Sequence, residues 1–343
     1  MQAPENAQRT MIARACASGC NRHNRPVLSV LSITFPFFAL VLAGWAATRR
    51  GWLPLPAIPG LNGFVLYFAL PCMLYRFGAE TPIAQLLDPV LAGVYLLCGL
   101  LLVAGTVAAT RRRWGWNDAA FGALVAAFPN SGFMGVPLLV ALLGEAAAGT
   151  VIPTVALDMV LTTSLCVALS RLSLGQGSAG RALRLALAGV LANPLPWSIA
   201  LGGLASATAF QLPGPLARTV GMLADAASPV ALFTIGAVLA RSQLNAHKQV
   251  AAGAYVPIAL AKLLLHPLLV WLACQAALAL GWTPAPLAVP TLVLVAALPS
   301  ASNVSLLAER FGAHGGRIAR VILVSTALAF LTFSGAVALL AAQ

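Results

Sequence analysis

The sequence predicts an all-α membrane protein of about ten helices, arranged as two inverted five-helix repeats whose fourth and ninth helices are broken. Three observations lead to this prediction. The 343-residue chain is 60% hydrophobic and 8% charged, whereas about a quarter of the residues of a soluble domain are charged. Apolar stretches long enough for a helix to cross a bilayer recur from end to end. One proline-containing phrase occurs twice, as LVAAFPNS at 124–131 and LVAALPSA at 294–301.

The apolar stretches divide the chain into two repeats. A tail at 1–26, predicted to be disordered, precedes the first repeat at 27–170, and a cytoplasmic linker at 171–183 precedes the second at 184–341. The ten predicted membrane spans are approximately 27–48, 57–77, 86–108, 119–143, 149–170, 184–208, 216–240, 250–274, 286–308 and 318–341.

The net charge of +12 is distributed unevenly between the two faces that these spans define. With the N-terminus outside, one face, apart from the tail, receives only Arg76 and Arg218. The other face receives Arg49, Arg50, Arg111, Arg112, Arg113, Arg171, Arg181, Arg184, Arg241, Lys248, Arg310, Arg317 and Arg320. Cytoplasmic loops carry such an excess of basic residues. We therefore expect a multi-pass protein of the cytoplasmic (inner) membrane with both termini outside, and no binding of nucleic acid.

The two halves correspond beyond the repeated phrase. The second span contains FALPCMLYRFG, with Pro71 and Gly78, and the seventh contains AASPVALFTIG, with Pro229 and Gly236. A flexible Gly/Ser segment, LSLGQGSAG, lies between the halves. Because five is an odd number, the second half enters the membrane from the opposite side, and the repeat is therefore inverted.

Pro129 and Pro299 each break a helix at membrane depth, because proline lacks a backbone N–H and clashes with the preceding turn. The predicted pieces are 119–128 and 130–143, and 286–298 and 300–309. The N-terminal end of each later piece has unpaired N–H groups and a partial positive charge. If the two helices run antiparallel, these ends meet from opposite directions, which favours an anion.

Small polar residues follow both prolines. We predict that six of them bind the substrate: Asn130, Ser131, Gly132, Ser300, Ser302 and Asn303. A side-chain amide offers two donors and an acceptor without charge, and glycine lets a ligand approach the backbone. The simpler alternative is that these residues only cap the half-helices or join neighbouring helices.

The segment PNSGFMGVPL at 129–138 resembles the fourth-helix motif of the auxin efflux carrier family, the PIN-like and bacterial malonate/malate permease group. The resemblance covers roughly residues 27–341. Other segments are similar to that family in the same order: LNGFVLYFALPCMLY at 61–75, Asn193-Pro194, SPVALFTIG at 228–236, KLLLHPLL at 262–269 and ALPSASN at 297–303.

The resemblance implies ten helices in two inverted repeats, with helices four and nine crossing at the substrate site, as in the crossover fold of bile-acid symporters and sodium–proton antiporters. It also implies transport of organic anions, with helices one, two, six and seven as a scaffold. The family's functional positions fall on Pro129, Asn130, Pro299 and Asn303, and also on Lys262. Ser300 is a departure, since bacterial relatives often have threonine there, but it keeps the hydroxyl.

Ionisable side chains within membrane spans are costly and usually functional. Asp158 lies near the centre of span five, and Lys262 lies in span eight, one turn before His266. Two roles fit Asp158: it carries a coupling proton, or it forms a structural ion pair with Lys262. Lys262 could also attract the substrate anion, whereas His266 precedes a proline and is expected to be a packing residue.

The leading hypothesis is a secondary transporter (permease) of small organic anions such as carboxylates, working by alternating access. The alternative is a sodium- or proton-coupled symporter or antiporter of the same fold with a bile-acid-type or other substrate. An enzyme is not expected, because the histidines are scattered and no nucleophile–base pair is visible. Neither a cofactor nor a metal is expected, since Cys16, Cys20 and His23 lack a second ligand pair. The partners are the substrate anion and the lipid bilayer; a coupling proton or sodium ion and a homodimer remain open.

Overall fold

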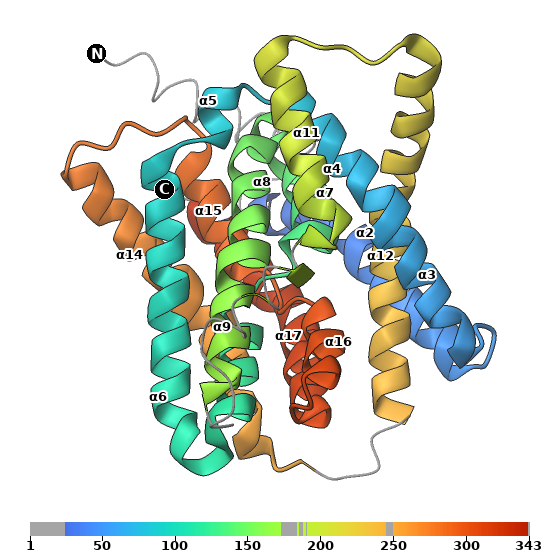
Figure 1. The fold of residues 1–343 in the computed structure, drawn as a ribbon, viewed down its shortest axis with the longest axis vertical. Helices are drawn as coiled ribbons and strands as arrows, with labels where there is room; N and C mark the ends of the chain where they lie inside the picture. Colours follow the sequence, from blue (N-terminus) through green and yellow to red (C-terminus); the bar gives the residue numbers. More distant parts are fainter. Residues whose placement is uncertain (1–24, 173–183, 185–187, 190, 245–249, 342–343) are drawn as a thin grey trace.

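The computed structural model describes residues 25–172, 184, 188–189, 191–244 and 250–341 (Figure 1). Helices account for nearly all of this part of the chain. The predictions for the tail up to residue 24, including the cysteines and the histidine there, lie outside the described residues, as do those for residues 173–183 of the linker.

The helices follow one another along the chain with few long connections. The α-helices are α2 (Arg25–Arg49), α3 (Ile58–Phe64), α4 (Leu70–Glu80), α5 (Ile83–Leu86), α6 (Pro89–Ala127), α7 (Val136–Leu143), α8 (Ala148–Leu157), α9 (Thr163–Ser170), α11 (Pro194–Thr208), α12 (Gly214–Leu244), α13 (Val256–Leu260), α14 (His266–Ala279), α15 (Ala288–Ala297), α16 (Asn303–Arg310) and α17 (Gly315–Ala341). Four π-helical segments are η2 (Val65–Ala69), η3 (Ser131–Gly135), η5 (Asp158–Thr162) and η8 (Ala261–Leu265). Three short 3₁₀ turns are η1 (Leu55–Ala57), η4 (Glu145–Ala147) and η7 (Ala252–Ala254).

Six helical stretches in the described part of the chain are long and apolar enough to cross a membrane. They are Leu55–Glu80, Ile83–Ala127, Glu145–Ser170, Gly214–Leu244, Val256–Ala279 and Gly315–Leu340. Two shorter apolar helices, Ser131–Leu143 and Ala288–Ala297, lie next to the two proline breaks. The prediction of a helical, multi-pass membrane protein is therefore confirmed, whereas the division into ten spans stays a prediction.

The long helix α6 contains a sharp change of direction. Gly115 has a φ of 76°, a backbone conformation that glycine adopts far more readily than other residues. The start of the helix is capped by Asp88, whose carboxylate accepts hydrogen bonds from the N–H groups of Val90 and Leu91. The third predicted span and the first piece of the fourth are thus consecutive helices that turn at Gly115.

Helices α2 and α12 pack backbone to backbone through two glycines. A Cβ atom at Gly236 of α12 would overlap the carbonyl oxygen of Val41, and one at Gly44 of α2 would overlap the carbonyl oxygen of Phe233. Small residues at the contacts between membrane helices permit such an approach. The two helices lie side by side in Figure 1.

A second pair, α4 and α11, meets in the same way. A Cβ atom at Gly202 would lie 2.7 Å from the carbonyl oxygen of Tyr75, and one at Gly78 would lie 3.3 Å from the Cα of Gly202. Together with α2, α3 and α12, this pair forms one side of the molecule in Figure 1, and α6, α14 and α15 lie toward the other side.

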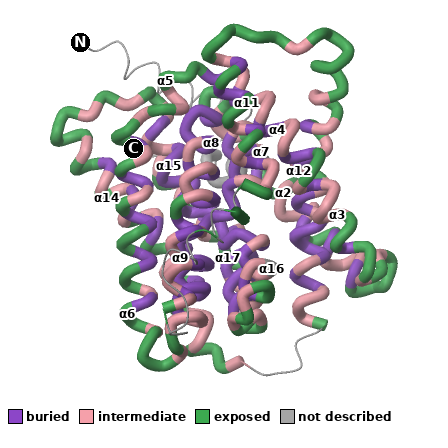
Figure 2. Tube along the Cα trace, in the orientation of Figure 1, coloured by how far each residue is buried: buried purple, intermediate pink, exposed green. Residues whose placement is uncertain are grey.

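The residues around the two breaks are buried almost without interruption (Figure 2). Every residue from 119 to 131 and from 291 to 302 is buried. Large apolar side chains such as Leu101, Leu268 and Leu331 are instead exposed on the outside of the molecule, as expected where helices face lipid. The proline breaks therefore lie in the protein interior.

Candidate functional site

The two proline breaks contact each other. The N–H of Asn130 donates to the carbonyl of Pro299 at 2.8 Å, and the N–H of Ala301 donates to the carbonyl of Phe128 at 3.0 Å. Pro129 and Ser300 thereby form an isolated antiparallel bridge. Each break therefore satisfies backbone groups that the other leaves without a helical partner, and the two copies of the repeated phrase meet.

The second break is also stabilised by side chains from two other helices. In an uninterrupted α-helix, the N–H of Ser300 would donate to the carbonyl of Ala296. Here that N–H donates to the Ser325 hydroxyl oxygen of α17 at 3.1 Å, and the Ala296 carbonyl accepts from the Lys262 ammonium group at 2.6 Å. Both ends of the missing helical hydrogen bond thus have new partners.

The predicted residues of the first break lie at the start of η3. Asn130 is buried, and its carbonyl accepts from the N–H groups of Met134 and Gly135 at 3.0 Å each. The Ser131 hydroxyl is buried and has only a long contact of 3.5 Å with the Pro129 carbonyl. Gly132 is half-buried beside α8, and a Cβ atom there would lie 4.0 Å from the Val155 side chain.

The predicted residues of the second break lie just before α16 and at its first position. Ser300 is fully buried, and Ser302 is 8% exposed with its carbonyl accepting from the Ser305 hydroxyl at 2.8 Å. Asn303 is half-buried and begins α16. The structure therefore brings Asn130 and Ser300 to the same bridge and places Asn303 one turn beyond it.

Three side chains at the breaks keep hydrogen-bonding capacity in the interior. The Oδ1 atoms of Asn130 and Asn303 and the Oγ atom of Ser300 are buried and have no hydrogen-bond partner among the described residues. Buried polar atoms nearly always have partners, so each exception needs an explanation. Grouped at a helix break, these atoms are candidates for binding a ligand.

Asp158 and Lys262 do not form the ion pair with each other that the sequence allowed. Within the described ranges, ion pairs join Arg76 to Asp225 and Arg317 to Asp118. A structural Asp158–Lys262 pair is not the arrangement found, because both groups are buried with other partners.

The partners of Asp158 and Lys262 place them in neighbouring polar clusters. The Asp158 carboxylate accepts from the Tyr95 hydroxyl at 2.6 Å and from the Thr162 hydroxyl at 3.1 Å. The Lys262 ammonium group lies 3.1 Å from Nδ1 of His266. The rings of Tyr95 and His266 are 6.1 Å apart between centroids, so the two clusters adjoin through these two buried rings.

Three of the four π-helical segments contain residues predicted for the site. Ser131 and Gly132 lie in η3, Asp158 begins η5, and Lys262 lies in η8. A π-turn inserts an extra residue into a helix and occurs often at functional positions. The backbone is therefore irregular at the very positions that carry the polar groups of the interior.

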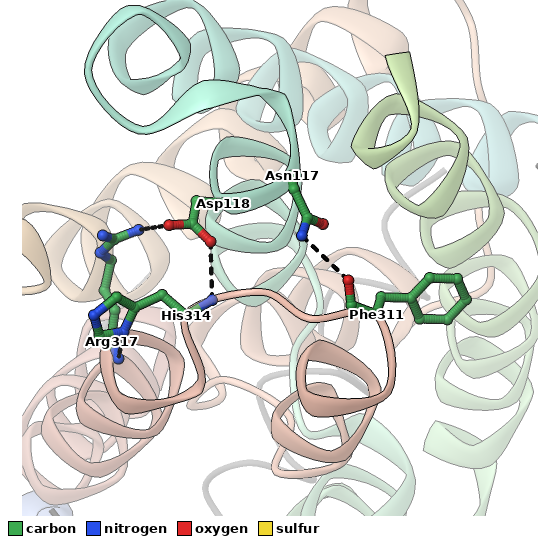
Figure 3. A network of polar contacts seen from close by, with 5 residues as sticks. All are labelled: Asn117, Asp118, Phe311, His314 and Arg317. Carbon is green, nitrogen blue, oxygen red and sulfur yellow. Dashed lines mark hydrogen bonds and ion pairs between the residues drawn. The ribbon is translucent and has the colours of Figure 1, made fainter. Parts of the chain in front are cut away.

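A separate polar cluster joins the two broken helices at one end (Figure 3). The Asn117 side chain donates to the Phe311 carbonyl at 3.2 Å. Asp118 accepts from the His314 N–H at 2.9 Å and from the Arg317 guanidinium at 3.2 Å. These contacts connect the part of α6 after Gly115 to the turn between α16 and α17, so the two broken helices are held together at their ends as well as at their breaks.

Two hollows reach the second break, and Asn303 lines both. The larger has a volume of about 300 Å³ and is lined mainly by apolar side chains from η2, α6, α16 and the start of α11. Its polar lining residues are Tyr67, Thr163, Asn193, Asn303 and Arg310. The smaller, of about 100 Å³, lies between α3, α12 and the break, and its polar lining residues are Asn62, Arg241, Ser302, Asn303 and Ser305.

Two residues of the site were not predicted from the sequence. Tyr95 binds Asp158, and Ser325 binds the freed N–H of Ser300. Tyr95 is a single hydroxyl-bearing aromatic residue within the apolar third span, so a search for isolated polar groups in spans would have found it. Ser325 lies in a helix with several Ser and Thr residues, and nothing in the sequence distinguishes it from them.

Comparison with known proteins gives consistent matches over most of the chain. The family described as "Membrane transport protein" matches residues 29–177 and 178–337. A "Putative malonate transporter" of Rhizobium meliloti (strain 1021) is 32% identical over 314 residues, which cover 89% of this chain and 94% of that protein. The "Uncharacterized transporter YfdV" of Escherichia coli (strain K12) is 24% identical over 286 residues, covering 81% of this chain and 87% of that protein.

Proposed function

The chain belongs to the auxin efflux carrier family of membrane transport proteins, and on that premise we propose that it is a secondary transporter of small organic anions. The observation that carries this proposal is the contact between the two breaks, with unpartnered polar atoms of Asn130, Ser300 and Asn303 around it. The substrate carboxylate would bind there, and movement of one group of helices against the other would open the site to each side in turn.

The proposal includes a ten-helix inverted repeat in which helices four and nine cross. The antiparallel bridge at Pro129 supports this arrangement. The glycine contacts support it as well, because Gly78 and Gly236 hold corresponding positions in the two halves. Gly78 packs on Gly202 in the first helix of the second half, and Gly236 packs on the helix of the first half that contains Gly44. A two-fold inverted repeat would generate such a pair of equivalent contacts.

An anion suits the chemistry at the breaks. The later pieces of both broken helices, η3 with α7 and α16, begin at this point, and helix N-termini attract carboxylates. The amide groups of Asn130 and Asn303 can turn to present N–H donors in place of oxygen. A hydroxyl, two amides and two helix ends can bind a carboxylate without a buried cation in direct contact with it.

Malonate is the first substrate to test, because the Rhizobium meliloti relative carries malonate in its name. We expect purified protein in liposomes to take up malonate or another small mono- or dicarboxylate from a panel. Asn130→Ala and Asn303→Ala should each reduce kcat/KM by at least about tenfold, since each removes a hydrogen bond to a charged group.

The matched control is Thr219→Ala, an exposed position on α12 that should transport like the wild type. Melting temperatures of all variants in detergent separate a loss of binding from a loss of folding. Unchanged uptake by both folded asparagine variants would contradict the proposed site.

Coupling to sodium or protons, with a bile-acid-type or other substrate, is the second candidate. The buried carboxylate of Asp158, which forms no ion pair within the described chain and is bound by two hydroxyls, supports it. In this alternative, Asp158 exchanges a proton or contributes to a sodium site while the anion binds at the breaks.

We also propose that the protein lies in the inner membrane with its strongly basic face in the cytoplasm and both termini outside. The uneven distribution of Arg and Lys supports this orientation. A reporter enzyme that works only outside the cytoplasm should therefore show activity when it is fused to the C-terminus. A homodimer is compatible with the proposal, and the mass of the purified protein in detergent tests it.

A further inference from the structure

A large hollow with a mixed apolar and polar lining opens beside the second broken helix. It has a volume of about 870 Å³ and lies between the end of α12, η7, α16 and the start of α17. The segments that surround it carry several of the basic residues that define the predicted cytoplasmic face. Its polar and charged lining residues include Arg241, Gln243, Tyr255, Ser305, Glu309 and Arg320.

This hollow is adjacent to the smaller one that reaches the break. Val238, Arg241 and Ser305 line both. The smaller hollow extends from these shared residues to Ser302 and Asn303. A continuous set of lining residues therefore leads from the basic face of the molecule to the unpartnered amide oxygen of Asn303.

Arg241 is the basic residue of this set that faces both hollows. It is half-buried near the end of α12 and has no hydrogen bond or ion pair with any described residue. The other arginine, Arg320, already contacts the Val250 carbonyl and the Tyr255 ring. Glu309 on α16 contributes a negative charge to the large hollow, but it does not line the small one.

We propose that the 870 Å³ hollow is the path by which the organic anion reaches the breaks from the basic face, and that Arg241 is the residue that first binds its carboxylate. An arginine can hold a carboxylate through two parallel hydrogen bonds. Because Arg241 faces both hollows, a carboxylate held there lies next to the site around Asn303. The proposal rests on the proposed function, and it assigns the selectivity for anions on this side to a residue outside the breaks.

The test compares uptake kinetics in liposomes for malonate, or for the carboxylate that the wild type transports fastest. Arg241→Gln should raise KM about tenfold while kcat changes little, because the loss affects binding before the conformational change. Arg241→Lys should retain part of the affinity, since the charge remains and the paired hydrogen bonds do not. The KM of the wild type should also rise more steeply with salt than that of Arg241→Gln.

Two further arginine variants serve as controls. Arg112→Gln removes an exposed charge on α6 that does not line this hollow, and it should leave KM unchanged. Arg310→Gln removes the arginine that lines the 300 Å³ hollow instead. If Arg310→Gln raises KM and folded Arg241→Gln does not, the anion uses the other hollow and the proposal is wrong.

A labelling experiment tests the path without altering Arg241. Ser305→Cys should react with a membrane-impermeant thiol reagent applied from the basic face, above the background of the wild-type cysteines, and substrate should slow the reaction. If no labelling occurs from that side, or if substrate does not slow the labelling, the proposed path is wrong.

If the wild type transports no carboxylate, the proposed function and this inference both fail. If Asn303→Ala abolishes transport while Arg241→Gln keeps the KM of the wild type, the proposed path through Arg241 fails and the proposed function stands.

Discussion

At the scale of single residues, each proline break leaves backbone groups that other residues must satisfy. Asn130 and Ala301 do this across the two breaks, and Ser325 and Lys262 do it from neighbouring helices. An unpaired backbone group in the interior costs far more than a hydrogen bond contributes on average. Lys262 therefore has a structural task at the Ala296 carbonyl, whatever further role it has toward the substrate.

Ser325→Ala should lower the free energy of unfolding by about 1–3 kcal/mol, because it leaves the buried N–H of Ser300 without its acceptor. Ser334→Ala on the same helix is the control, since its buried hydroxyl has no partner in the described chain, and its removal should cost little. Chemical unfolding in detergent measures both. Equal stability of the two variants would mean that the Ser325 contact does not stabilise the break.

At the scale of the helices, close packing through glycine joins the helices in pairs. The backbones of α2 and α12 approach so closely at Gly44 and Gly236 that no larger side chain fits. The same is true of α4 and α11 at Gly202. These contacts support the assignment of α2, α4, α11 and α12 to one rigid scaffold, against which the broken helices would move.

Gly236→Ala should destabilise the protein by about 1–3 kcal/mol or more, because its Cβ would overlap the Val41 carbonyl and force the helices apart. Gly221→Ala on the same helix is the matched control. A Cβ atom there meets nothing within 4 Å, and alanine favours a helix by roughly 0.5–1 kcal/mol over glycine. Melting temperatures should therefore move in opposite directions, and a neutral Gly236→Ala would contradict the packing described.

The sequence predicted part of this element-scale organisation. The helix breaks beside Pro129 and Pro299 and the family itself were predicted correctly, because each depends on a local pattern of residues. The ten-helix inverted repeat and the substrate-binding roles stay predictions. The structural ion pair that was one of the two alternatives for Asp158 and Lys262 is not among the ion pairs of the described residues. Asp158 accepts hydrogen bonds from Tyr95 and Thr162, and Lys262 contacts His266 and the Ala296 carbonyl.

At the scale of the whole molecule, the buried polar clusters connect the broken helices to the helices around them. Tyr95 lies on α6, Asp158 on η5, and Lys262 on η8, which binds the end of α15. A proton or sodium ion that alters Asp158 would therefore act on helices that hold both breaks. This arrangement is the physical reason for proposing a coupled mechanism.

If transport is coupled through Asp158, an imposed proton or sodium gradient should stimulate uptake by the wild type. Asp158→Asn should lose that stimulation but keep exchange of substrate across the membrane, because the anion site is intact. Thr162→Val, which removes one hydroxyl donor to the same carboxylate, should keep the stimulation. Uptake by the wild type that ignores both gradients would exclude coupling, and Asp158 would then be a purely structural residue.

The sequence by itself determined the helical class, the positions of the two breaks, the polar residues beside them and the uneven distribution of charge. These properties depend on residue type and on short spacings along the chain. Only the tertiary structure decided that Asn130 binds Pro299, that Lys262 binds Ala296 and that Arg241 lines a hollow that reaches Asn303. In a membrane helix the lipid-facing and protein-facing sides are both apolar. The sequence pattern therefore leaves helix rotation open, and the packing of backbones at the breaks and the glycines decides which polar groups meet.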